Sequence, residues 1–178
     1  ECKPKYFLLE NVRMKKEYLQ VISEQVSACY PEIPFGIEPI FINSSLVSAQ
    51  SRPRYYWTNI PGVKQPKQRG IVLRDILETR QIEGLTDKPI QEPKVLAGAY
   101  RARSIDKDGN RVEWKEAKPQ QMLELRKDNK SNSITSVQKD NVLTKDEVYW
   151  RKLTCRECER LQTVPDNYTN HVSNTQRY

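Results

Sequence analysis

The chain has 178 residues and 37% apolar content, enough for one domain or two small lobes with a modest core, which excludes a disordered chain. No apolar run approaches the roughly 20 residues of a membrane span, and nothing resembles a signal peptide, so we expect a soluble intracellular protein. Lys and Arg (30) exceed Asp and Glu (23), and this excess of +7 favours a polyanionic partner such as nucleic acid.

The first apolar run, FLLENV at residues 7–12, ends in a carboxylate and an amide. It predicts a buried strand that places Glu10 at its carboxyl end, where open α/β sheets bind ligands. The alternative is a strand that simply ends in polar residues. Residues 13–29 have helical periodicity and predict a crossover helix packed on the sheet, and residues 37–47 predict a second strand.

A polar turn at residues 48–54 holds Arg52 and Arg54 and leads into an aromatic strand, residues 55–60. We expect both guanidiniums to enter the same sheet region as Glu10. An arginine presents a planar fork of donors to a carbonyl or phosphate, and a partly buried glutamate can hold a proton for donation. Together they suit an uncharged planar ring. In the alternative reading, Glu10 and Arg54 only pair with each other.

Residues 64–146 hold 18 Lys/Arg and 13 Asp/Glu, so the basic excess is concentrated there. We expect short helices near residues 73–77 and at residues 120–126. Between them, strands at residues 98–105 and 110–115 flank the turn sequence DKDG, which predicts a hairpin with Arg101 and Arg103 on one face. The alternative is a solvated hairpin face. A hydroxyl-rich stretch, residues 130–136, is either a phosphate-contacting segment or a plain loop.

Near the end of the chain, Thr154 and Glu157 have the spacing of a capping box and predict a helix that starts there and ends near Pro165 and Asn167. This helix contains the CxxC pair within the scattered set of four cysteines. Zinc needs about four ligands and the chain has a single histidine, so we predict no metal site and two ordinary helix residues; a metal or redox role is the alternative. The cysteines are Cys2, Cys29, Cys155 and Cys158, and the histidine is His171.

Three of these blocks, in this order, resemble DNA (cytosine-5)-methyltransferases. FLLENV resembles that family's ENV motif, and Gln50-x-Arg52-x-Arg54 resembles its QxRxR motif. Residues 151–166, RKLTCRECERLQTVPD, resemble the pattern RxLTxRExxRLQxFPD, with Cys155 in place of the usual proline and Val164 in place of an aromatic residue. The ending, residues 168–174, is similar to the vertebrate de novo branch and its phage or prophage relatives.

The resemblance implies an α/β fold, with a partial class I (Rossmann-like) methyltransferase sheet and a small mixed target recognition domain. Residues 1–63 would be the second half of the catalytic domain, residues 64–146 the target recognition domain, and residues 147–178 a helix and a return toward the catalytic domain. The partners implied are S-adenosylmethionine and double-stranded DNA with a flipped cytosine.

The resemblance also implies roles for individual residues. Glu10 would hold N3 and the exocyclic amine of the cytosine, and Arg54 would bind its O2. Four residues would support the site: Arg52 in the loop or on a phosphate, Asn11 and Gln50 in the local backbone, and Glu157 through the helix that braces the recognition domain. DNA contacts would come from Arg101, Arg103, Arg111, Ser133 and Thr135.

Two parts of that chemistry are absent from the sequence. The family's nucleophile is a thiolate in a Pro-Cys motif, and no Pro-Cys dipeptide occurs here; the glycine-rich cofactor motif is absent as well. We therefore expect a C-terminal fragment or split subunit of a prokaryotic or phage restriction-modification enzyme, inactive alone, whose missing N-terminal half carries both. It would act in the bacterial cytoplasm, at the nucleoid. The alternative is a non-catalytic DNA-binding or regulatory methyltransferase-like module.

Overall fold

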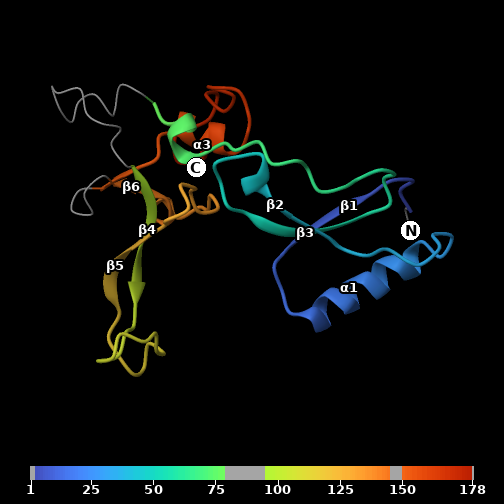
Figure 1. The fold of residues 1–178 in the computed structure, drawn as a ribbon, viewed down its shortest axis with the longest axis horizontal. Coiled ribbons are helices and arrows are strands. Elements are labelled where there is room, and N and C mark those ends of the chain that lie inside the picture. Colours follow the sequence, from blue (N-terminus) through green and yellow to red (C-terminus); the bar gives the residue numbers. More distant parts are fainter. Residues whose placement is uncertain (1–2, 79–94, 145–149, 178) are drawn as a thin grey trace. The chain divides into compact units, whose positions relative to one another are not determined.

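The computed structural model describes residues 3–78, 95–144 and 150–177 (Figure 1). The chain divides into two compact units. Unit 1 comprises residues 1–47 and 52–69, and unit 2 comprises residues 48–51 and 70–178. In the described part, the fold is mixed α/β with two antiparallel sheets and the helices α1 and α3. Neither helix is long and apolar enough to cross a membrane, and the same holds for the rest of the described chain.

Unit 1 is a three-stranded sheet with one helix. Its strands have the order β1-β3-β2, and the central strand is antiparallel to both neighbours. The edge strands therefore run in the same direction and end at the same side of the sheet. The elements are β1 (Leu8–Val12), α1 (Lys16–Cys29), β2 (Ile40–Asn43), the 3-10 helix η1 (Ser44–Leu46) and β3 (Pro53–Thr58).

The predicted helix in unit 1 is confirmed as α1, and it packs on one face of this sheet. Trp57 on β3 is fully buried, and its indole N–H donates to Ser23 Oγ on α1 at 2.9 Å. Around it lie the apolar residues of the helix, spaced at three and four positions, because that spacing places them on one helical face. The partly buried helix residues of this cluster are Leu19, Ile22 and Val26.

The prediction of a buried first strand is wrong. β1 is an edge strand, and Leu8 and Val12 are 59% and 54% exposed. Glu10 is the third of its five residues and does not stand at the carboxyl end. Helix α1 covers the face that holds Trp57, and side chains alternate between faces along a strand, so the opposite face of β1 stays in solvent. A continuous apolar run does not distinguish these environments.

Unit 2 is built on a four-stranded antiparallel sheet with the order β5-β4-β6-β7. Its core joins this sheet to the short helices, with Leu73, Leu143 and Leu161 almost fully buried. The elements are η2 (Leu73–Ile76), β4 (Leu96–Arg103), β5 (Gln120–Leu125), η3 (Gln138–Asp140), β6 (Val142–Thr144), β7 (Trp150–Lys152) and α3 (Cys155–Leu161).

Two predictions in unit 2 need correction. Residues 120–126 were predicted as a helix, yet residues 120–125 form β5, which pairs with β4 from Gly98 to Arg103. The DKDG turn does form, with a bridge between Ile105 and Arg111, but residues 110–115 form no continuous strand after it. The alternation of Leu123, Glu124 and Leu125 suits a strand, and six residues are too few for periodicity to exclude a helix.

Helix α3 begins as predicted and ends earlier. Thr154 is its N-cap, and the helix stops at Leu161 because Thr163 adopts a left-handed φ of 61°. The CxxC pair lies on this helix, as predicted, and Cys158 faces the core of unit 2. Burial, together with the neighbouring Cys155, Glu157 and Glu159, raises the pKa of Cys158 to about 12, so its thiol stays protonated at neutral pH.

Candidate functional site

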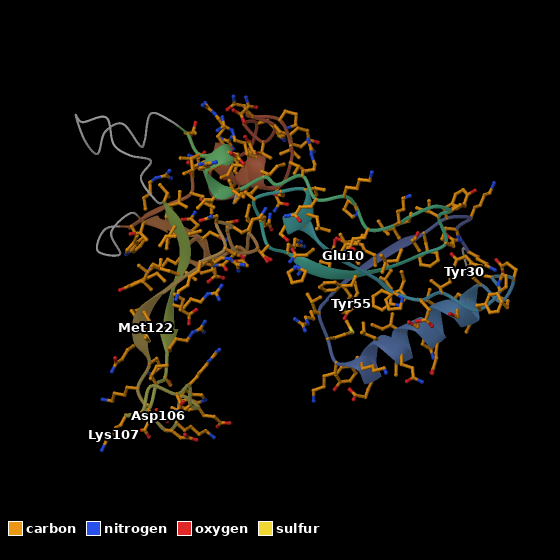
Figure 2. The ribbon with its side chains drawn as sticks, viewed as in Figure 1. Glu10, Tyr30, Tyr55, Asp106, Lys107 and Met122 are labelled. Carbon is orange, nitrogen blue, oxygen red and sulfur yellow. The ribbon has the colours of Figure 1, made fainter. Side chains whose placement is uncertain are left out.

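Glu10 forms ion pairs with both Arg52 and Arg54, the two arginines expected in its sheet region. Its Oε1 accepts hydrogen bonds from Arg52 Nη2 and from Arg54 Nε, each at 3.1 Å. Glu10 is the register partner of Tyr56 on β3, next to the buried Trp57, so it lies on the sheet face opposite α1 (Figure 2). The structure thus brings together the three charged residues that the sequence singled out.

The cluster is open to solvent. The exposed fractions of the side chains are 42% for Glu10, 33% for Arg52 and 14% for Arg54. Glu10 is therefore more exposed than the partly buried glutamate expected from the sequence, because helix α1 packs on the opposite face of the unit 1 sheet. Glu10 Oε2 accepts no hydrogen bond from the described part of the chain. One carboxylate oxygen is thus bound to two guanidiniums, and the other is available to a ligand.

Tyr56 is a residue of this site that the sequence reasoning missed. It stands directly opposite Glu10 across the β1–β3 pair. Partial burial raises the pKa of its phenol, and the charge of Glu10 adds to this effect. The phenol therefore stays neutral at physiological pH and offers a hydroxyl and an aromatic ring beside the carboxylate. The alternation along residues 55–60 could have placed it on the face of Arg54.

Of the predicted supporting residues, Asn11 bonds its neighbour in the chain, whereas Gln50 bonds residues far away in the sequence. Asn11 Oδ1 accepts from the Val12 N–H at 2.8 Å. Gln50 belongs to unit 2 and is 1% exposed; its Nε2 donates to the Leu161 carbonyl at 3.3 Å, and its Oε1 accepts from the Ile134 N–H at 3.2 Å. The first residue of the QxRxR motif therefore fixes the end of α3, while its two arginines bind Glu10.

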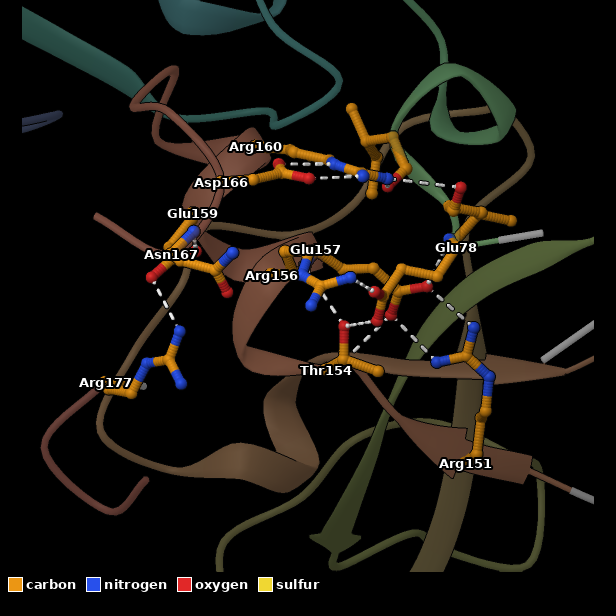
Figure 3. A network of polar contacts seen from close by, with 12 residues as sticks. Glu78, Arg151, Thr154, Arg156, Glu157, Glu159, Arg160, Asp166, Asn167 and Arg177 are labelled. Carbon is orange, nitrogen blue, oxygen red and sulfur yellow. Dashed lines mark hydrogen bonds and ion pairs between the residues drawn. The ribbon is translucent and has the colours of Figure 1, made fainter. Parts of the chain in front are cut away.

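Glu157 is the centre of a polar network that starts α3 (Figure 3). It is fully buried, and both its oxygens accept from the Arg151 guanidinium at 2.8 Å. Further bonds come from the N–H groups of Thr154 at 2.9 Å and Glu78 at 3.1 Å, which confirms the capping box. Burial acts to raise the pKa of Glu157, but the bonds from Arg151 and Thr154 outweigh it and leave this pKa below its usual range.

The same network holds the segment that follows η2. Glu78 accepts from the Thr154 hydroxyl and from Arg156, each at 2.7 Å. Arg160 donates to the Ile76 carbonyl at 3.0 Å and makes a two-pronged ion pair with Asp166 at 2.8 and 2.6 Å. The charged residues of the third sequence block therefore have structural partners within unit 2, which explains why arginines and carboxylates alternate there.

Glu159 anchors the end of the chain, a role the sequence did not reveal. The carboxylate is 3% exposed and accepts from the N–H groups of Asn167 at 2.6 Å and Thr169 at 2.9 Å. The Thr169 hydroxyl also donates to it, as does Arg177 Nη2 at 2.8 Å. The Thr169 hydroxyl and Arg177 lower the pKa of Glu159 to about 2. No local spacing rule links these partners, so sequence alone gives no signal for them.

Most of the predicted DNA-binding side chains are engaged within unit 2. Arg101 pairs with Asp140 at 2.6 Å, and Arg103 makes two hydrogen bonds to Glu124, one of them at 2.7 Å. Ser133 Oγ donates to the Ser51 carbonyl at 3.0 Å, and Thr135 Oγ1 donates to Asp140 Oδ2 at 2.8 Å. Arg111 is exposed, and its side chain has no ion pair within the described residues. Whether these residues contact DNA stays a prediction.

Replacing Glu157 with glutamine should destabilise the protein by roughly 3 kcal/mol, because it leaves Arg151 facing a neutral group in a buried site. Urea unfolding measures the change. The matched control is Glu113→Gln, an exposed glutamate, which should stay within about 0.5 kcal/mol of the native protein. A Glu157→Gln protein as stable as the control would contradict a structural role for the network.

The Glu159 network should make stability fall in acid. Its folded pKa of about 2 lies below the roughly 4.3 of an unfolded glutamate, so its contribution is complete above that value and is lost as the pH falls toward 2. Urea unfolding between pH 5 and pH 2.5, conditions set by these two values, should show this decline. Glu159→Gln should flatten it, whereas the exposed control Glu116→Gln should not; identical profiles for all three would contradict the assignment.

Comparison with known protein families identifies the class of protein. The model of the family described as C-5 cytosine-specific DNA methylase matches residues 1–178. A comparison with curated proteins found no match. The family match covers the whole chain, including the Glu10 cluster and the α3 network. The chain therefore belongs to the C-5 cytosine-specific DNA methylase family.

Proposed function

We propose that this chain holds the target cytosine and contacts DNA within a DNA (cytosine-5)-methyltransferase, which transfers a methyl group from S-adenosylmethionine to cytosine. The observation that carries the proposal is the Glu10 cluster. A carboxylate with one free oxygen stands beside two arginines on an open sheet face, in a chain of this family. Such a set of acceptors and donors matches the polar edge of a flipped pyrimidine.

Each group in the cluster would have a separate task. The Glu10 carboxyl accepts from the exocyclic amine and supplies a proton or hydrogen bond to N3, which favours addition of a thiolate at C6. Arg54 donates to O2, with its guanidinium already oriented by the bonds to Glu10 and to the Pro53 carbonyl at 2.8 Å. Arg52 steadies the carboxylate from the other direction or contacts a phosphate.

The site for S-adenosylmethionine would lie mostly outside these residues. Neither turn that follows β1 or β2 contains glycine, whereas a backbone that must approach a bound cofactor closely uses glycine. The 178 residues also contain no Pro-Cys dipeptide. We infer that the nucleophile and the cofactor site belong to a part of the enzyme outside these residues, in one chain or as a separate subunit.

The remaining assignments rest on the sequence resemblance. Residues 1–63 would belong to the second half of a Rossmann-like catalytic domain, residues 64–146 would recognise the target, and residues 147–178 would lead back to the catalytic domain. The complete enzyme would come from a phage or bacterium, in a branch similar to the de novo enzymes, and act on nucleoid DNA in the cytoplasm as part of restriction and modification.

A second function, a regulatory module without chemistry, is favoured by one observation. Glu10 is already paired with both arginines, so each charged residue of the cluster has an ion-pair partner without substrate. In such a module the cluster would serve only to hold β1 and β3 together, and the surface around it would bind DNA.

The experiment that separates the two uses the complete enzyme, formed with the part that carries the nucleophile. Glu10→Gln should lower methyl transfer roughly 10²- to 10⁴-fold, because the amide cannot supply a proton to N3, while duplex DNA affinity changes little. Tritium transfer from labelled S-adenosylmethionine and a gel-shift titration measure the two effects.

The matched control is Glu38→Gln, which removes an exposed carboxylate of unit 1 that has no contact with the cluster. It should retain native turnover. Full activity of the Glu10→Gln enzyme would refute the catalytic assignment and favour the regulatory module.

A further inference from the structure

At one end of the unit 1 sheet, two strands finish and the third begins. Because β3 is antiparallel to both neighbours, β1 and β2 finish where β3 begins. The register places Val12 opposite Arg54, and Asn43 opposite Pro53. With a spacing of about 4.8 Å between strands, the two outer strands end roughly 10 Å apart. The segments that follow β1 and β2 therefore both start at this end of the sheet.

Cations dominate this end of the sheet. Arg13, Lys15 and Lys16 follow β1 directly and are exposed. Arg69 reaches the same end from further along the chain, because its N–H donates to the Leu46 carbonyl, just after β2, at 2.7 Å. No carboxylate pairs with any of these four side chains among the described residues. Together with Arg52, they form what we call the basic end: Arg13, Lys15, Lys16, Arg52 and Arg69.

The start of α1 makes this arrangement electrostatically unfavourable without a partner. Lys15 is the N-cap and makes no side-chain cap hydrogen bond, and Lys16 is the first helical residue. Both place positive charge at the positive end of the helix dipole, where an acidic residue is usually preferred. Glu17 offsets only part of this charge. An anion bound at the basic end would relieve the repulsion and satisfy free N–H groups of the first turn.

The hairpin tip of unit 2 offers a useful contrast. Residues 104–119 contain as many acidic as basic side chains and carry no net charge. The arginines nearest to it, Arg101 and Arg103, are paired with Asp140 and Glu124. The basic end of unit 1 therefore carries a positive charge that the hairpin tip does not, although the sequence directs attention to the insert.

We propose that the basic end binds the phosphate backbone of duplex DNA next to the cytosine held at Glu10. This inference rests on the proposed function for the identity of the polyanion. β1 ends at Val12, two residues beyond Glu10 and about 7 Å from it at 3.3 Å per residue, and Arg13 follows directly, so a DNA backbone bound at the basic end would pass close to the Glu10 cluster. Cations spread over such a distance act together, because it is close to the screening length at physiological salt.

The test uses the full 178-residue chain and a fluorescein-labelled 20-base-pair duplex, with binding followed by fluorescence anisotropy between 50 and 200 mM salt. The triple variant Arg13→Gln, Lys15→Gln, Lys16→Gln should lose roughly tenfold in affinity at low salt. The slope of log affinity against log salt concentration should become less negative by about 2 to 3, because each phosphate contact that is removed contributes roughly one unit of slope. Circular dichroism checks that the variant is folded.

The control removes charge from the opposite end of the same sheet, at two exposed lysines that precede β1 and lie outside residues 64–146: Lys3→Gln, Lys5→Gln. It should change the slope by less than one. Equal losses per charge in both variants, an unchanged slope in the first, or a native chain that does not bind the duplex would each overturn the proposal. The outcome is independent of Glu10→Gln turnover, so loss of the catalytic assignment and loss of the phosphate surface are distinguished.

Discussion

Unit 2 depends on one buried charge, the carboxylate of Glu157. A carboxylate with no exposure is costly unless every lone pair has a partner, and Arg151, Thr154 and the Glu78 backbone supply those partners. These three contacts join β7, the start of α3 and the segment after η2. A purely apolar contact could hold the same elements together, but it would not fix their register, whereas paired charges of fixed geometry do.

Features that depend on a few neighbouring residues could be predicted from the sequence. The capping box of α3, the periodicity of α1 and the DKDG turn are local, and the structure contains all three. Burial is not local. The exposed face of β1 and the pairing of residues 120–125 with β4 depend on which elements cover or meet them, and an apolar run or a short mixed segment fits more than one outcome.

The candidate site shows the same division. Residue types and motif order were enough to pair Glu10 with Arg52 and Arg54 across 42 and 44 positions. They did not reveal Tyr56 as the neighbour of Glu10, nor Glu159 as the anchor of residues 167–177. Glu159 accepts hydrogen bonds from two backbone N–H groups. Almost every residue has such a group, so the residue types at positions 167 and 169 do not predict these two bonds.

The division of the QxRxR motif gives a physical reason for its spacing. Gln50 is buried in unit 2, where its amide N–H donates to the Leu161 carbonyl and its amide oxygen accepts from the Ile134 N–H. Arg52 and Arg54 belong to unit 1 and both bind one oxygen of Glu10. A residue that bonds a backbone donor and a backbone acceptor at once must carry both kinds of group, as the Gln50 amide does and as a carboxylate or a cation does not. Positions 52 and 54 hold donors to the Glu10 carboxylate, and arginine keeps its positive charge at any physiological pH. The segment from Gln50 to Arg54 thus supplies a buried packing residue to unit 2 and two arginines to the Glu10 cluster of unit 1.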